Sequence, residues 1–295
     1  MSYFHLNLIL KGKLTVCCLL MLPAIPLNAQ REAKQIGDFK ESISLNEHLR
    51  GTKRTLQYRP DGDEFVCVNG KNRYTRALYG SHSPFRVETS DRPVFAFYNN
   101  GRGGNISFKV ILRDGTELAL DCTGHCESRY SAGKRTYYLT DPSWGKGELR
   151  ISVLALADMD GAIWRFSPSN MPKGAILRWQ HGGATGKRLS RNGDMGVDPA
   201  DCFELPVEAT DLVTGELPLQ KEVYLVRGEV PEDYNVRKLY QQAEAASLAL
   251  ASHLKIETPD PYLNTLGGAL VAAADGIWDG QVWLHGAIGW RMPLS

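Results

Sequence analysis

Residues 106–120, ISFKVILRDGTELAL, carry the pattern that decides the fold of this 295-residue chain. Apolar and polar side chains alternate from Ile106 to Arg113, which is the period of a half-buried β-strand. Asp114-Gly115 is a tight-turn pair, and a second run returns from it to Leu120. The stretch therefore predicts a β-hairpin.

Short runs of the same kind lie on both sides of this hairpin. They cover residues 64–68, 93–98, 135–140, 148–156, 162–166, 175–180 and 221–226. Turn signals separate them, such as Asn69-Gly70 and the DMDG stretch at 158–161. About ten to twelve strands at this spacing indicate a mostly β fold, namely a large antiparallel β-sandwich.

The pattern becomes helical after residue 233. Apolar residues recur near a 3.6-residue period over residues 236–254, and Asp233 or Asn235 can cap the helix start. The sequence TPDP at 258–261 ends this helix, and residues 262–277 form a second helical run. We predict a β-sandwich domain over residues 30–232 and a linker helix within 233–260. Residues 261–295 are then the first piece of an incomplete helical domain.

The first 29 residues have the layout of a secretory signal peptide. Lys11 and Lys13 precede the apolar run LTVCCLLML at 14–22, which is too short to span a bilayer. We predict cleavage after Ala29 and no membrane span afterwards. The mature protein is then periplasmic, associated with the outer membrane, or secreted. A lipid anchor on Cys17 or Cys18 is the alternative.

Charge gives little indication of a charged partner. Lys and Arg number 34 against 33 Asp and Glu, a formal net charge of +1. This balance predicts neither a nucleic-acid surface nor a polyacidic partner.

Export implies an oxidising compartment for the cysteines that remain after cleavage. These are Cys67, Cys122, Cys126 and Cys202. Cys122 and Cys126 are close in sequence and are the candidate disulfide pair. Free buried thiols are the alternative, and a zinc site that includes His125 lacks a fourth ligand at recognised spacing. We predict no metal site and no cofactor.

Candidate substrate-binding residues gather in residues 261–295, and they are Trp278, Asp279, Trp283, His285, Trp290 and Arg291. Flat indoles could stack on sugar faces, and an arginine could pair with a uronate carboxylate. Each also has a structural explanation. Tryptophan supplies buried core area, Arg291 suits a domain interface, and Asp279-Gly280 is a turn pair. Catalytic residues are not identified by the sequence.

The order of sandwich, linker helix and tryptophan-rich helical start resembles two-domain carbohydrate-active proteins with a six-hairpin (α/α) toroid. The motif Trp278-Asp279-Gly280, followed by WLHGAIGWR at 283–291, resembles the toroid entry of exported proteins from bacterial polysaccharide-utilisation systems. That group is known as a domain of unknown function. The resemblance implies glycan processing, with a glycan or oligosaccharide as the ligand of the full-length relatives.

Our hypothesis is therefore the N-terminal portion of an exported glycan-degrading, glycoside hydrolase-like protein that is not catalytically complete by itself. Its expected partner is the missing C-terminal helical domain. Without that partner, we expect the segment from Tyr262 onward to fold poorly. The alternative function is a non-catalytic carbohydrate-binding or scaffolding module.

Overall fold

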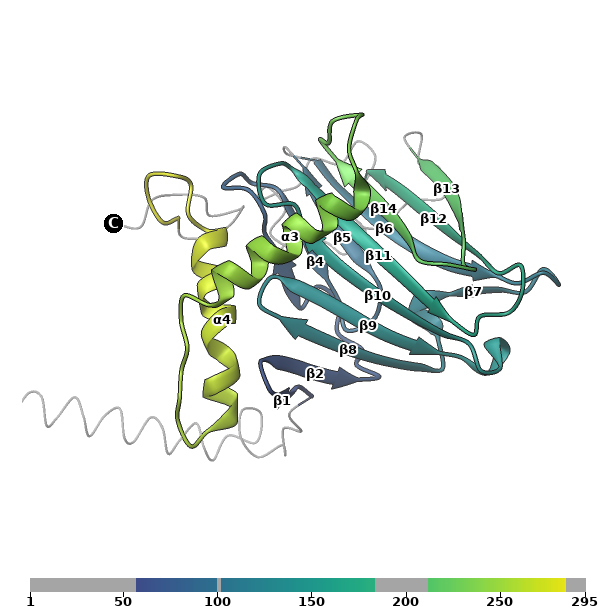
Figure 1. Ribbon diagram of the computed structural model, residues 1–295, viewed down its shortest axis with the longest axis horizontal. Helices are drawn as coiled ribbons and strands as arrows, with labels where there is room; N and C mark the ends of the chain where they lie inside the picture. Colours follow the sequence, from purple (N-terminus) through teal and green to yellow (C-terminus); the bar gives the residue numbers. More distant parts are fainter. Residues whose placement is uncertain (1–56, 100–101, 184–211, 285–295) are drawn as a thin grey trace, which may run out of the picture. The chain divides into compact units, whose positions relative to one another are not determined.

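The computed structural model describes residues 57–99, 102–183 and 212–284. Within these residues fourteen strands form two antiparallel sheets, and two helices follow them in the chain (Figure 1). The predicted mostly β fold is confirmed. The predicted signal peptide, Cys202 and all residues from 285 onward lie outside the described residues.

Each sheet contains seven strands. The first sheet has the order β1 (Arg59–Asp61), β2 (Glu64–Val68), β8 (His125–Ser131), β9 (Lys134–Thr140), β10 (Glu148–Ala155), β11 (Gly161–Ser169) and β14 (Val223–Gly228). The second has the order β13 (Val213–Pro218), β12 (Ile176–Gly183), β6 (Arg102–Ile111), β5 (Phe95–Asn99), β4 (Arg86–Thr89) and β3 (Arg76–Leu78). Its seventh strand, β7 (Glu117–Ala119), pairs with β6.

The hairpin that the sequence predicts most clearly is the β6–β7 pair. At its turn, the Leu112 N–H donates to the carbonyl of Thr116 over 2.9 Å. Gly115 has φ +89°, a left-handed conformation that glycine adopts without steric cost. The return strand ends one residue before the predicted Leu120, which begins a short 3-10 helix, η2 (Leu120–Cys122).

The core lies between the two sheets and is centred on aromatic rings. Phe95 of the second sheet meets Tyr137 and Trp164 of the first, with ring centroids 5.8 and 5.7 Å apart. A third contact joins Phe95 to Phe108 of its own sheet at 5.8 Å. All three contacts are edge-to-face, the geometry that the ring quadrupoles favour. The inner faces of both sheets therefore interdigitate as in a β-sandwich.

The first helix covers part of the outer face of the first sheet. This helix is α3 (Val236–Ala251), and its start is capped by Asn235, whose side chain accepts from the N–H of Lys238 over 3.0 Å. Leu239 and Tyr240 on its inner side pack against Leu154 of β10 and Ile163 of β11. The predicted helix is confirmed, although it ends before the predicted Leu254.

The second helix is α4 (Pro261–Gly276), which lies against α3 and β1 (Figure 1). The Thr265 hydroxyl donates to the carbonyl of Gly62 over 2.9 Å, and Ala272 is buried. Helix α4 therefore lies on the sandwich, and poor folding of this segment without its partner stays a prediction. The small residues of α4 make the contact, whereas Leu263 and Leu270 remain 47% exposed. Neither described helix is long and apolar enough to cross a membrane.

Candidate functional site

A short hairpin directly after α4 holds two of the predicted tryptophans. We call residues 277–284 the tryptophan hairpin. Trp278 and Trp283 form an antiparallel bridge, and their ring centroids are 4.7 Å apart. The hairpin is anchored by Leu284, which is buried and donates its N–H to the carbonyl of Ile277 over 2.9 Å. Trp283 is 54% exposed, so an indole surface faces solvent.

Asp279 has a structural position in this hairpin. Its carboxylate accepts from the backbone N–H groups of Gln281 and Val282 over 2.9 and 2.8 Å. Gly280 follows with φ +97°, a conformation that suits glycine. The carboxylate therefore closes the turn that holds the two indoles together, which is the structural explanation of Asp279. Substrate binding by Asp279 stays a prediction.

Asp275 belongs to a different contact. It lies in the last turn of α4, and its carboxylate is 3.2 Å from Nε2 of His82. The turn bonds of Asp279 and the His82 contact of Asp275 give these two carboxylates separate structural partners. The remaining predicted site residues, His285, Trp290 and Arg291, lie outside the described residues.

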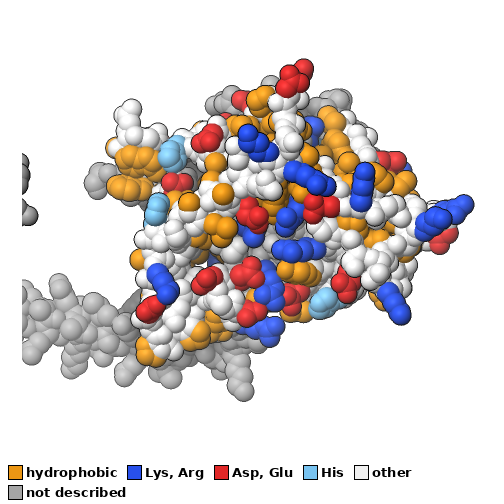
Figure 2. Space-filling view, in the orientation of Figure 1, with side chains coloured by type: hydrophobic (Ala, Val, Ile, Leu, Met, Phe, Trp, Pro, Cys, Tyr) orange, Lys and Arg blue, Asp and Glu red, His pale blue; other side chains and the backbone are white. Residues whose placement is uncertain are grey.

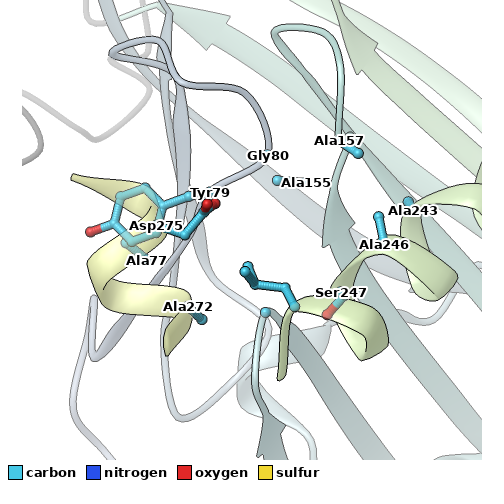
Figure 3. A pocket seen from close by; sticks show the side chains of 12 residues that line it. Ala77, Tyr79, Gly80, Ala155, Ala157, Ala243, Ala246, Ser247, Ala272 and Asp275 are labelled. Carbon is cyan, nitrogen blue, oxygen red and sulfur yellow. The ribbon is translucent and has the colours of Figure 1, made fainter. Parts of the chain in front are cut away.

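A hollow of about 190 Å³ lies where α3 and α4 meet the sandwich. Figure 3 shows Ala243 and Ala246 of α3 on one side of it, and Tyr79 and Asp275 on the other. The Ser247 hydroxyl already donates to the carbonyl of Ala132 over 2.6 Å. Burial, aided by the charge of Glu88, raises the pKa of Tyr79 to about 12, so its phenol keeps its proton. Alanines make up half of the lining, so the hollow suits a small apolar group better than a sugar.

The most polar cluster of the interior is structural. Arg135 and Asp91 have fully buried side chains, and the Arg135 guanidinium lies 3.6 Å from the Asp91 carboxylate. Asp91 also accepts hydrogen bonds from the Tyr58 hydroxyl and, over 2.9 Å, from the N–H of Asn72. Because β9 carries Arg135 and Asp91 follows β4, the pair links the two sheets. The side chains of Arg135 and Asp91 are therefore closed to a substrate.

The cysteines of the described residues are free thiols. Cys126 points into the interior, where its thiol donates to the carbonyl of Asp91 over 3.6 Å, whereas Cys122 is exposed at the end of η2. The predicted Cys122–Cys126 disulfide is therefore not formed in this structure, because one thiol is inside the sandwich and the other at its surface. Burial raises the pKa of Cys126 to about 12.

Thiol labelling checks this assignment. At pH 8 we expect iodoacetamide to modify Cys122 in the folded protein, and to modify Cys126 only after denaturation, because the thiolate is the nucleophile and access is required. Peptide mapping of the alkylated protein measures both sites separately. A cross-linked Cys122–Cys126 peptide, or equal labelling rates at the two sites, would contradict the structure.

Comparison with known proteins finds a similarity over part of the chain. Residues 100–230 match a family described as a domain of unknown function (DUF4450). This range begins just before β6 and ends after β14, so it includes most of both sheets and excludes the tryptophan hairpin. No curated protein matches the sequence.

Proposed function

We propose that this chain is part of an exported glycan-processing protein and that the tryptophan hairpin binds a saccharide. The exposed indole of Trp283, held beside Trp278 by a closed turn, is the observation that supports the proposal. A sugar ring presents C–H groups on one face, and a flat indole offers those groups an apolar surface to cover. Tryptophan provides this area with few rotatable bonds, so binding orders little additional side chain.

The proposed catalytic partner is a C-terminal helical domain of the toroid type. Support comes from the apolar side chains that α4 leaves exposed, Leu263 and Leu270. Burial of one large apolar side chain contributes on the order of 1.5–3 kcal/mol, which favours further helices packed on this surface. Export of the protein rests on the signal-like sequence of residues 1–29.

A non-catalytic carbohydrate-binding module is the second candidate. The partners of the two nearby carboxylates favour it, since Asp279 closes a turn and Asp275 contacts His82. Glycoside hydrolysis commonly needs two carboxyl groups on either side of the scissile bond. An assay for release of reducing sugars from the bound polysaccharide separates the two candidates.

The binding proposal predicts a large effect of Trp283→Ala. We expect the affinity for a soluble polysaccharide that retards the parent protein to fall at least about tenfold. A tenfold loss corresponds to 1.4 kcal/mol of binding free energy, which the loss of one stacked indole can account for. Affinity electrophoresis of the whole chain through polysaccharide-containing gels measures this change. Tyr262→Ala is the matched control, since it removes an exposed aromatic ring from α4. Unchanged retardation of Trp283→Ala would refute the proposal.

A further inference from the structure

A second surface with ligand-binding character lies on the outer face of the first sheet. The strand register places Glu127, Tyr138, Arg150 and Ser167 side by side across β8, β9, β10 and β11. The register also places His125, Thr140, Glu148 and Ser169 in the adjacent row. Residues two apart in a strand point to the same side, so both rows share one face. They line a hollow of about 480 Å³.

This face combines charges with an exposed ring. Figure 2 looks onto it and shows positive and negative side chains intermixed over the strands. Tyr138 is 38% exposed, and the Arg150 guanidinium lies 5.3 Å from its ring centroid. Hydroxyl groups of Thr140 and Ser169 also border the hollow. The lining therefore offers one apolar wall and several hydrogen-bonding groups, the usual mixture in a small-ligand site.

Two charged groups in the hollow have no ionic partner among the described residues. Glu127 is paired with Arg129 over 2.6 Å, and Arg129 also binds Asp61 of β1 and Glu64 of β2. Arg150 makes no such pair, and its Nε is buried without a hydrogen-bond partner. Glu148, two residues earlier in β10, is likewise unpaired within the described chain. That Nε is covered by the protein, so the terminal nitrogens of the guanidinium, which make no ion pair among the described residues, are the groups that can donate to a ligand in the hollow.

We infer that this hollow binds a neutral saccharide unit, with Arg150 donating to its hydroxyl oxygens and Glu148 accepting from its hydroxyl groups. The choice of a saccharide rests on the proposed function, whereas the surface is separate from the tryptophan hairpin. The two unpaired charges cancel, so the site attracts neither an anion nor a cation overall. A uronate carboxylate would gain Arg150 but face repulsion from Glu148. All the residues of this site lie within the matched range 100–230.

The test uses the whole chain in affinity gels that contain galactomannan, xyloglucan or arabinogalactan as neutral probes and polygalacturonate as the acidic probe. We expect retardation in at least one neutral gel. Arg150→Ala and Glu148→Gln should each weaken that retardation about tenfold, and Tyr138→Ala should weaken it at least as much. Arg178→Ala is the control, because Arg178 is a paired arginine on the second sheet.

The variants separate this inference from the proposed hairpin site. Retention that survives Trp283→Ala but is lost in Arg150→Ala supports the hollow and refutes binding at the hairpin. If Trp283→Ala abolishes retention and Tyr138→Ala, Glu148→Gln and Arg150→Ala leave it unchanged, the hollow is not a binding site. The proposed binding at the tryptophan hairpin is then still supported. If polygalacturonate is the only probe that retards the protein, the inference of a neutral ligand is wrong. If no gel retards the protein, the inferred binding site is wrong.

Discussion

Replacement of Arg135 by methionine is expected to lower the free energy of unfolding by about 3–5 kcal/mol at pH 7, the usual result of removing one partner of a buried ion pair. Methionine keeps much of the side-chain volume but leaves the fully buried Asp91 without its cation. Ser90 and Ser128 also lose the donor that Arg135 provides over 3.2 and 3.1 Å. Urea denaturation followed by tryptophan fluorescence measures the difference.

The loss should depend on pH with a definite sign. Burial already raises the pKa of Asp91, against the lowering effects of the Asn72 N–H and Arg135. Without the cation that pKa rises further, so the folded variant favours the protonated carboxyl more than the unfolded chain does. The unfolded chain titrates alike in variant and parent, so the destabilisation develops as pH rises through the raised folded pKa of Asp91 in the parent, and it is smaller near pH 4 than at pH 7. Arg178→Met, at an exposed ion pair, should change stability little. A loss for Arg135→Met as small as that control would contradict the structural role of the pair.

Replacement of Phe95 by alanine is expected to cost about 3–5 kcal/mol, the range for a buried phenylalanine. The ring lies at the contact between the sheets, where it meets Tyr137, Trp164 and Phe108 edge-on. Neighbours from two sheets cannot all close the resulting cavity. Phe95→Leu fills part of the space and should cost less. Equal stabilities of the alanine and leucine variants and the parent protein would show that the two sheets are not packed on this ring.

The sequence predicts those strands in which the buried positions carry apolar residues and the exposed positions carry polar ones. Strand β2 matches the predicted range 64–68, and the β6–β7 hairpin has the predicted turn. Strand β8 was missed because its inward positions are Cys126, Ser128 and Tyr130, where a buried serine interrupts the apolar alternation. The burial of Arg135 could not be predicted from the sequence either. An arginine in a strand normally marks a position that is exposed to solvent.

The candidate sites show the same limit. Trp278 and Trp283 were found because two tryptophans close in sequence around a turn pair also lie close in space. The row from Glu127 to Ser167 joins four strands, so only the register of the sheet brings its members together. The particular contacts of α4 could not be predicted either, because Gly276 and its other small residues carry little apolar signal. A side chain at Gly276 would place its Cβ 2.2 Å from the Tyr79 ring.

Glycan binding by this chain, as proposed above, can be tested by a binding screen of the fluorescently labelled whole chain on a microarray of plant, microbial and host glycans. We expect reproducible binding to at least one neutral oligosaccharide series, with signals that fall in Trp283→Ala and remain in Tyr262→Ala. Absence of binding to every immobilised glycan by folded protein, at concentrations up to the millimolar range typical of weak sites (about 4 kcal/mol of binding energy), would contradict it.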